Sequence, residues 1–169
     1  IAVSAFTRSF LFSRDPALVE EASLEKAVCV IPNAVDTASI PFVAHTPSND
    51  VRRILSVSAV KRKKGYLQAV DALAAFCARH PDHAIRYDII GSLAHEPSFV
   101  EELRGYIRVR GLDEIIHLRG SVDEAELQSA YASADLFLLL SLQDGVYVEG
   151  FGLVFLEANA YGVPVIGPT

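Results

Sequence analysis

The sequence predicts an α/β fold with a doubly wound parallel sheet of the Rossmann-like kind. Short apolar runs alternate with longer segments in which apolar residues recur every three or four positions, so strands and helices should alternate along the chain. Such alternation favours parallel strands joined by helices. The run DLFLLLS at 135–141 is apolar at most positions, as expected of a strand covered on both faces. With 169 residues, 51% of them hydrophobic, the chain can build one domain with a substantial core.

The first fifty residues are expected to be less regular than the rest. Residues 9–22 have a helical pattern broken near Pro16, and KAVCVIP at 26–32 is predicted to be a short buried strand. The stretch 32–50 holds three prolines and many turn-forming residues, which is typical of a linker or a domain crossing.

Regular structure is predicted from residue 51 onward. We expect strands at 52–60, 85–93, 114–122, 135–141 and 163–167, and helices at 65–80, 98–112, 123–134 and about 153–161. Gly111 is expected to end the second of these helices, and Asp123 to cap the start of the third.

Composition excludes several classes of protein. A net charge of −6 disfavours nonspecific nucleic-acid binding, which needs a basic surface. Cys29 and Cys77 lack metal-ligand spacing and are expected to be reduced core residues of a cytosolic protein, so no metal site is predicted. The uncharged apolar run 136–142 is too short to cross a bilayer, and no signal peptide is visible. Because the chain contains no methionine, we expect it to be part of a longer protein.

A ligand site is predicted at the carboxyl ends of the strands, where doubly wound sheets bind their ligands. Four loops end there: SAVKRKKG (58–65), GSLAHEPS (91–98), RGSVDE (119–124) and SLQDGVYVEGFG (141–152). Each brings polar residues or glycine directly after an apolar strand.

The last loop and the helix after it carry two glutamates, Glu149 and Glu157. Gly150 and Gly152 allow close backbone approach, and the start of the helix offers unpaired N–H groups to an anion. Carboxylates would repel a phosphate, so we expect them to accept hydrogen bonds from sugar or ribose hydroxyls. The alternative is that Glu149 caps the helix and Glu157 is merely solvated. The apolar neighbours of Glu157 favour a functional role, because an idle carboxylate is costly to bury.

Four consecutive cations, Lys61–Lys64, follow the first strand of the sheet and precede Gly65. We call this segment the basic turn. It predicts binding of a diphosphate, with Lys64 as the cation that points inward. The alternative, an exposed basic run, is expected to hold for most of the four side chains.

These segments together resemble the retaining glycosyltransferases of the GT-B fold, especially family 4. EGFGLVFLEANAYGVPVIG is similar to the E-x7-E signature of that family. The resemblance extends to SVSAVKRKKGYLQAVDAL, YDIIGS and GLDEIIHLRGSVDEAELQSAYASADLFLLLS, and upstream to VSAFTRSFL and VIPNAVDTASI. It covers nearly the whole chain in the order and spacing of the family.

The resemblance implies a role for each matching residue. Glu149 would be the catalytic carboxylate against the donor sugar, and Glu157 would bind the ribose hydroxyls. Lys64 would neutralise the diphosphate, so that neither metal nor cofactor is needed. Backbone N–H groups would hold sugar hydroxyls at Gly150, Phe151 and Gly152, and the distal phosphate at Leu153 and Val154. The loops carrying Gly91, Arg119, Ser121 and Val122 would flank the base.

Two departures from the family pattern affect the donor. Where many relatives carry a Gly-Arg pair, this chain has Ser58 and Ala59, so Lys61, Arg62 or Lys63 would supply the second diphosphate cation. The loop before Glu149 is longer than the common form, as in mannosyltransferases acting on lipid or polysaccharide acceptors. This feature favours GDP-mannose over a UDP-sugar as the substrate and leaves the identity of the base open.

The resemblance also implies a domain organisation. Residues 1–35 would be the end of the acceptor domain and the crossing segment, 36–50 a linker, and 51–169 the donor-binding domain, incomplete at its C-terminal end and inactive alone. The expected protein is a cytoplasmic hexosyltransferase, in peripheral contact with membrane through its missing domain, with a glycan or lipid acceptor. Two alternatives stay open, a GT-B sugar-nucleotide epimerase and a non-catalytic nucleotide-binding module.

Overall fold

The computed structural model describes residues 2–14, 28–37, 40, 51–142 and 152–168. Its helices and strands, in chain order, are α1 (Ala5–Arg14), β1 (Arg52–Val57), η1 (Arg62–Lys64, a 3₁₀ turn), α4 (Tyr66–Arg79), β2 (Ile85–Ile90), α5 (Pro97–Val109), β3 (Ile116–Gly120), α6 (Glu124–Ser133), β4 (Leu136–Leu138), α7 (Leu153–Ala160) and β5 (Val165–Ile166). The alternation of strands and helices expected from residue 51 onward is confirmed.

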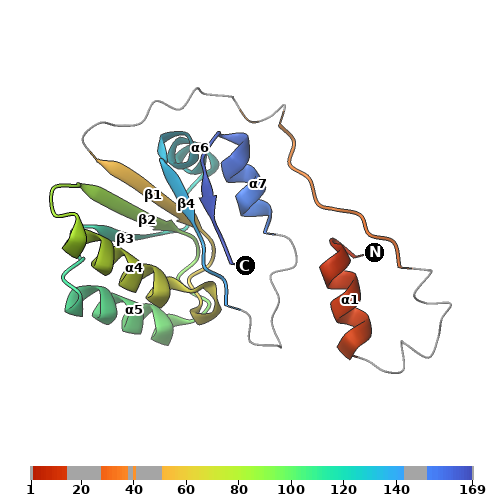
Figure 1. The fold of residues 1–169 in the computed structure, drawn as a ribbon, viewed down its shortest axis with the longest axis horizontal. Helices are drawn as coiled ribbons and strands as arrows, with labels where there is room; N and C mark the ends of the chain where they lie inside the picture. The colour runs from red at the N-terminus through yellow and green to blue at the C-terminus, as the bar shows by residue number, and fades with distance from the viewer. Residues whose placement is uncertain (1, 15–27, 38–39, 41–50, 143–151, 169) are drawn as a thin grey trace.

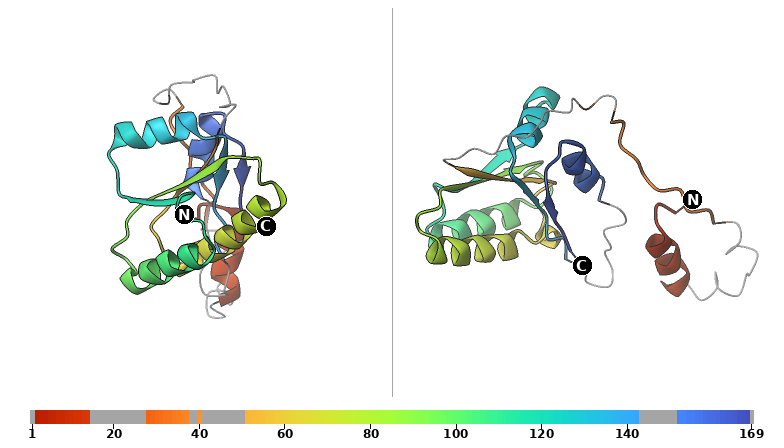
Figure 2. Two further views of the ribbon diagram at one scale, coloured as in Figure 1. Left: turned by 90° about the vertical axis from the view of Figure 1, so that its left-hand side faces the viewer. Right: turned by 45° about the horizontal axis from the view of Figure 1, so that its top comes forward.

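The strands form one sheet in the order β3-β2-β1-β4-β5, and every neighbouring pair is parallel. Helices α4 and α5 cover one face of this sheet and α6 and α7 the other, as Figures 1 and 2 show. This is the doubly wound arrangement predicted from the sequence. The order reverses between β1 and β4, and the chain leaves these two adjacent strands toward helices on opposite faces.

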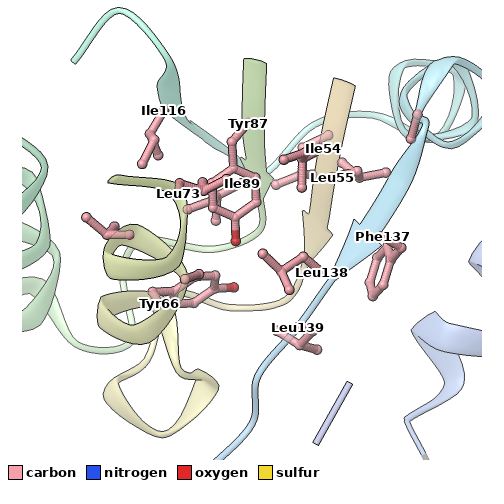
Figure 3. Packing of buried hydrophobic residues seen from close by; sticks show 14 of the residues in the cluster. Ile54, Leu55, Tyr66, Leu73, Tyr87, Ile89, Ile116, Phe137, Leu138 and Leu139 are labelled. Carbon is pink, nitrogen blue, oxygen red and sulfur yellow. The ribbon is translucent and has the colours of Figure 1, made fainter. Parts of the chain in front are cut away.

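The core lies between the sheet and the helices on both its faces, and Figure 3 shows part of it. Tyr66, Tyr87, Leu55 and Ile89 are each at most 2% exposed. One buried polar residue, Ser56, joins three strands: its hydroxyl lies 2.6 Å from the Tyr87 hydroxyl on β2 and donates to the Leu138 carbonyl on β4. These bonds satisfy polar groups that would otherwise be costly to bury.

Both expected helix boundaries are confirmed. Gly111 has a left-handed φ of 67° just beyond α5, and its N–H donates to the Arg108 carbonyl. Asp123 is the N-cap of α6, where its carboxylate accepts from the Glu126 N–H at 2.8 Å.

The predicted buried strand at 26–32 is wrong in its described part, residues 28–32. There Val30 makes a single parallel bridge to Ala2, held by two backbone hydrogen bonds of 2.8 Å. Cys29 is exposed, which corrects its expected place in a core, and Ile31 is 53% exposed. Apolar side chains alone do not make a buried strand, and the five-stranded sheet does not include this segment. Cys77, on α4, is half-buried.

No helix within the described ranges combines the length and the apolar character needed to cross a bilayer.

Candidate functional site

The loops after β1 and β4 meet at the carboxyl edge of the sheet, where the strand order reverses. Gly65, which follows η1, has a φ of 71°, and a Cβ placed on it would lie 2.0 Å from the Leu140 carbonyl oxygen. The Leu142 N–H donates to the Lys63 carbonyl at 2.7 Å. The basic turn is therefore fastened to the exit of β4, just before residues 143–151, which lie outside the described residues. Only glycine fits at position 65, for reasons of both conformation and space.

A second close approach connects the loops after β1 and β2. A Cβ on Gly91, whose φ is 147°, would lie 2.1 Å from the Ser58 carbonyl oxygen. The Gly91 N–H donates to the Gly120 carbonyl at 2.9 Å, which adds the end of β3 to the same edge. Together with the bond between Leu142 and Lys63, these contacts connect all four loops predicted to form a site through their backbones.

The side chains of the basic turn differ in their surroundings. The Arg62 guanidinium forms a two-pronged ion pair with Glu102 on α5, and it lies 4.8 Å from the centre of the Phe99 ring. Its backbone N–H donates to Glu96 at 2.9 Å. The Glu102 hydrogen bond raises the pKa of Arg62. Arg62 therefore binds the turn to α5, and its charge is already offset. Lys61, Lys63 and Lys64 are half-buried in this part of the structure.

Helix α7 begins at the same edge with Gly152 as its N-cap, at a φ of 64°. Its first two residues, Leu153 and Val154, belong to the turn whose N–H groups have no acceptor within a helix. The helix thus begins at the residue predicted from the sequence. The remaining predicted residues of this loop, Glu149, Gly150 and Phe151, lie outside the described residues.

Glu157, one turn into α7, is half-buried and has a partner that the sequence did not indicate. The hydroxyl of Tyr131 on α6 donates to its Oε2 at 2.8 Å. Tyr131 is 2% exposed, and its ring stacks on Tyr161 with 5.4 Å between centroids. Glu157 is thus neither idle nor merely solvated.

Glu157 and Tyr131 line a cavity of about 440 Å³ between α6, α7, residues 34–36 and Ile40. We call it the acidic cavity. Three carboxylic side chains line it, from Asp36, Glu124 and Glu157, and none of the described residues around it is a lysine or an arginine. Such a lining suits a ligand rich in hydroxyl groups and disfavours an anion.

The residues predicted to flank the nucleotide base of the donor divide into two groups. Arg119 is engaged by other side chains: it pairs with Glu126 on α6, and its Nη1 lies 3.6 Å from Oδ1 of Asp88. Ser121 is exposed and Val122 packs against the core, both directly after β3. The structure therefore brings Gly91, Ser121 and Val122 to the carboxyl edge, while it holds the Arg119 side chain against β2 and α6.

Sequence reasoning missed three features of this region: the hydrogen bond of Tyr131 to Glu157, the bonds of Arg62 in the basic turn to Glu96 and Glu102, and the contact of Gly65 with Leu140. All three depend on contacts across 26 or more positions, for which local patterns give no signal.

Within the described residues there is no group of three or more His, Cys, Asp and Glu side chains that could hold a metal ion.

The fold and its glycine-lined carboxyl edge define an α/β domain of the doubly wound, Rossmann-like class. More particularly, the chain belongs to the family of glycosyl transferases group 1, whose family model matches residues 42–167. It is 34% identical over 113 residues to a D-inositol 3-phosphate glycosyltransferase from Arthrobacter sp. (strain FB24), covering 67% of this chain and 25% of the relative.

Two solved structures share the fold. A glycosyltransferase from Rickettsia africae aligns with a TM-score of 0.75 at 22% identity, over 94% of this chain and 42% of that one. Anabaena HepE, crystallised in complex with UDP and glucose, aligns with a TM-score of 0.72 at 22% identity, over 98% and 43% of the respective chains. The chain thus spans about a quarter of that curated relative and less than half of each of these structures.

Proposed function

We propose that the chain forms the donor-binding part of a retaining glycosyltransferase. The enzyme would transfer a hexose of the mannose or glucose type from a nucleoside-diphosphate sugar to a glycan or lipid acceptor. One observation carries this proposal: the family match spans all five strands of the sheet and includes the basic turn, the start of α7 and Glu157.

The separation of charge at the carboxyl edge supports a nucleoside-diphosphate sugar as the ligand. Such a ligand has a doubly charged diphosphate between two hydroxyl-bearing rings. The basic turn and the N-terminus of α7 offer positive charge and N–H donors for the diphosphate, with Lys64 as its main cation. The acidic cavity, with Glu157, offers acceptors for the ribose hydroxyls.

In this proposal the leaving diphosphate is neutralised by side chains and helix N–H groups rather than by a metal ion. The second cation is Lys61, Arg62 or Lys63, of which Arg62 is paired with Glu102. Glu149 would stand against the donor sugar, with the backbone of Gly150 to Gly152 holding its hydroxyls.

The fold shared with HepE, whose structure contains UDP and glucose, is compatible with a nucleotide-sugar donor. The nucleotide base of the donor is inferred from a different feature. The extended loop before Glu149 favours GDP-mannose over a UDP-sugar, and a direct titration distinguishes the two.

The first experiment is a calorimetric titration of the chain with GDP, UDP, ADP and their common sugar conjugates in the presence of EDTA. We expect saturable binding of one nucleotide series without metal, and the preferred base identifies the nucleotide of the donor. Absence of binding by a folded sample, both here and in a longer form of the protein, would overturn the proposal. Binding without sugar transfer in the longer form would favour a non-catalytic nucleotide-binding module.

Substitution of the two glutamates tests their separate roles. Loss of a hydrogen bond to a charged group costs about 1.5–3 kcal/mol, so Glu157→Ala should weaken binding of the nucleotide and its sugar conjugates alike, by about tenfold or more. Glu149→Ala should weaken only the sugar-bearing ligands. Equal effects of both substitutions on free GDP would contradict this division.

A further inference from the structure

The hydrogen bond between Tyr131 and Glu157 connects α6 to α7 at the acidic cavity. The Tyr131 hydroxyl lies 2.8 Å from Oε2 of Glu157, and the tyrosine is almost completely buried. Its ring stacks on Tyr161, at 5.4 Å, and on Phe137 of β4, at 6.0 Å. Because the ring is buried and in contact with two other aromatic rings, the hydroxyl has little freedom to turn away from the carboxylate.

This geometry makes Tyr131 a permanent donor. Burial, together with the hydrogen bond and the charge of Glu157, raises the pKa of the Tyr131 hydroxyl, so it stays protonated throughout the physiological range. A phenol has one proton to donate, whereas an ionised carboxylate has about four acceptor positions on its two oxygens. The bond fixes the carboxylate through Oε2 and leaves the acceptor capacity of Oε1 for a ligand in the cavity.

A purely structural role does not account for the choice of partner. The Tyr131 hydroxyl lies at the lining of the cavity, where water or an uncharged side chain would satisfy a single donor. A half-buried carboxylate is a more costly partner, because burial disfavours its charge. The arrangement is better explained if the carboxylate is the group whose position matters.

We propose that Tyr131 is a positioning residue, which fixes the Glu157 carboxylate in the orientation that accepts hydrogen bonds from the ribose hydroxyls of the donor. The inference rests on the proposed function, because it requires a nucleotide in the acidic cavity. It assigns a role in ligand binding to a residue of α6 that has no place in the predicted site.

The test is a comparison of Tyr131→Phe with the unaltered chain, titrated with GDP and with 2′,3′-dideoxy-GDP, and with the two corresponding UDP ligands in parallel. Phenylalanine keeps the ring stack and removes only the hydroxyl. We expect Tyr131→Phe to weaken binding of the hydroxyl-bearing nucleotide about five- to tenfold, and to change the dideoxy nucleotide by less than about twofold. If the hydroxyl had only a structural role, its removal would weaken the binding of the hydroxyl-bearing and the dideoxy nucleotide alike, which would contradict the inference.

A double-mutant cycle shows whether Tyr131 acts through Glu157. In a Glu157→Ala background, the substitution Tyr131→Phe should have no further effect on the preference for hydroxyl-bearing nucleotides. The matched control is Tyr87→Phe, which removes another buried hydroxyl that bonds to Ser56 in the core. It should lower stability without altering the preference.

The outcomes separate the inference from the proposed function. If the unaltered chain prefers GDP or UDP over its dideoxy form and Tyr131→Phe keeps that preference, the inference is overturned and the proposed function stands. If the unaltered chain and its longer form bind none of the nucleotides, the proposed function fails, and the inference fails with it. If Tyr131→Phe does not fold, the cycle is repeated with Tyr131→His and Glu157→Ala. Additive effects of these two substitutions on the preference for hydroxyl-bearing over dideoxy nucleotides would show that the residues act independently, and would overturn the inference.

Discussion

Gly65 shows how one residue determines the shape of the carboxyl edge. Its left-handed φ lets the chain turn from η1 into α4, and its missing side chain makes room for the carbonyl of Leu140. The basic turn can therefore lie directly against the exit of β4. Any side chain at this position would separate the two loops that carry the proposed diphosphate and sugar contacts.

The substitution Gly65→Ala is expected to be strongly destabilising. A left-handed φ costs a non-glycine residue about 1–2 kcal/mol, and overpacking adds about 1–3 kcal/mol. We expect the free energy of unfolding to fall by about 3 kcal/mol, as measured by urea denaturation. The matched control is Gly111→Ala, where φ is 67° but no heavy atom lies within 4 Å of the added Cβ. That variant should lose only about 1–2 kcal/mol, and equal losses would refute the close contact.

At the scale of elements, the start of α6 depends on the cap provided by Asp123. Its carboxylate accepts from the Glu126 N–H at 2.8 Å. Removal of such a cap typically costs about 1 kcal/mol, so Asp123→Ala should lower the unfolding free energy by that amount. Asp123→Asn keeps the acceptor and serves as the control, with nearly unchanged stability in the same denaturant titration. A large loss in Asp123→Asn would indicate that charge, rather than the cap, is what matters.

A network of charges joins β2, β3 and α6 on the face of the sheet opposite α4. Asp88 accepts from Arg86 at 2.8 and 3.0 Å, and Arg119 lies 3.6 Å away on β3. Burial acts to raise the pKa of Asp88, but the hydrogen bonds and charge of Arg86, with the charges of Arg119 and His117, prevail and lower it.

The lowered pKa of Asp88 predicts how stability depends on pH. A carboxyl group whose pKa is lower in the folded state stabilises the fold at pH values above its ordinary pKa. This contribution is lost as the pH falls through the pKa of the folded state. The unaltered chain should therefore lose stability below about pH 4, the ordinary value for aspartate. Asp88→Asn should be less stable at pH 7 and should lose less on acidification. Parallel stability curves for the two proteins between pH 7 and pH 3 would contradict the assignment.

The elements differ in how well the sequence predicts them. Strands and helices after residue 51 have periodic apolar patterns, and their ends carry glycine or capping residues, so local physics is sufficient to find them. KAVCVIP has the composition of a strand, but a buried strand also needs a partner sheet, which no local pattern reveals. The contacts of Tyr131 with Glu157 and of Arg62 with Glu102 likewise depend on the packing of helices remote in the sequence. The site was therefore predictable as a set of loops, whereas the partners of its side chains were not.

For the whole molecule, the distribution of charge matters more than its sum. The chain carries a net charge of −6, yet four consecutive cations gather at one loop of the carboxyl edge, and carboxylic side chains line the cavity between α6 and α7. An anionic ligand is repelled by the molecule as a whole and attracted locally by the basic turn. The two effects have different ranges, and dissolved salt screens both.

Salt should therefore separate the phosphate contacts from the hydroxyl contacts of a bound nucleotide. The screening length falls from about 10 Å at 0.1 M salt to about 3 Å at 1 M, which weakens attraction between the lysines of the basic turn and a diphosphate. We expect GDP or UDP to bind roughly tenfold more weakly at the higher salt concentration, and the uncharged nucleoside to bind almost equally at both. Lys64→Ala should reduce this salt dependence, whereas Arg108→Ala, on α5 beside Asp113, should leave it unchanged. Calorimetric titrations at the two salt concentrations provide the measurement, and equal salt dependence of the nucleoside and the nucleotide would rule out the basic turn as the diphosphate site.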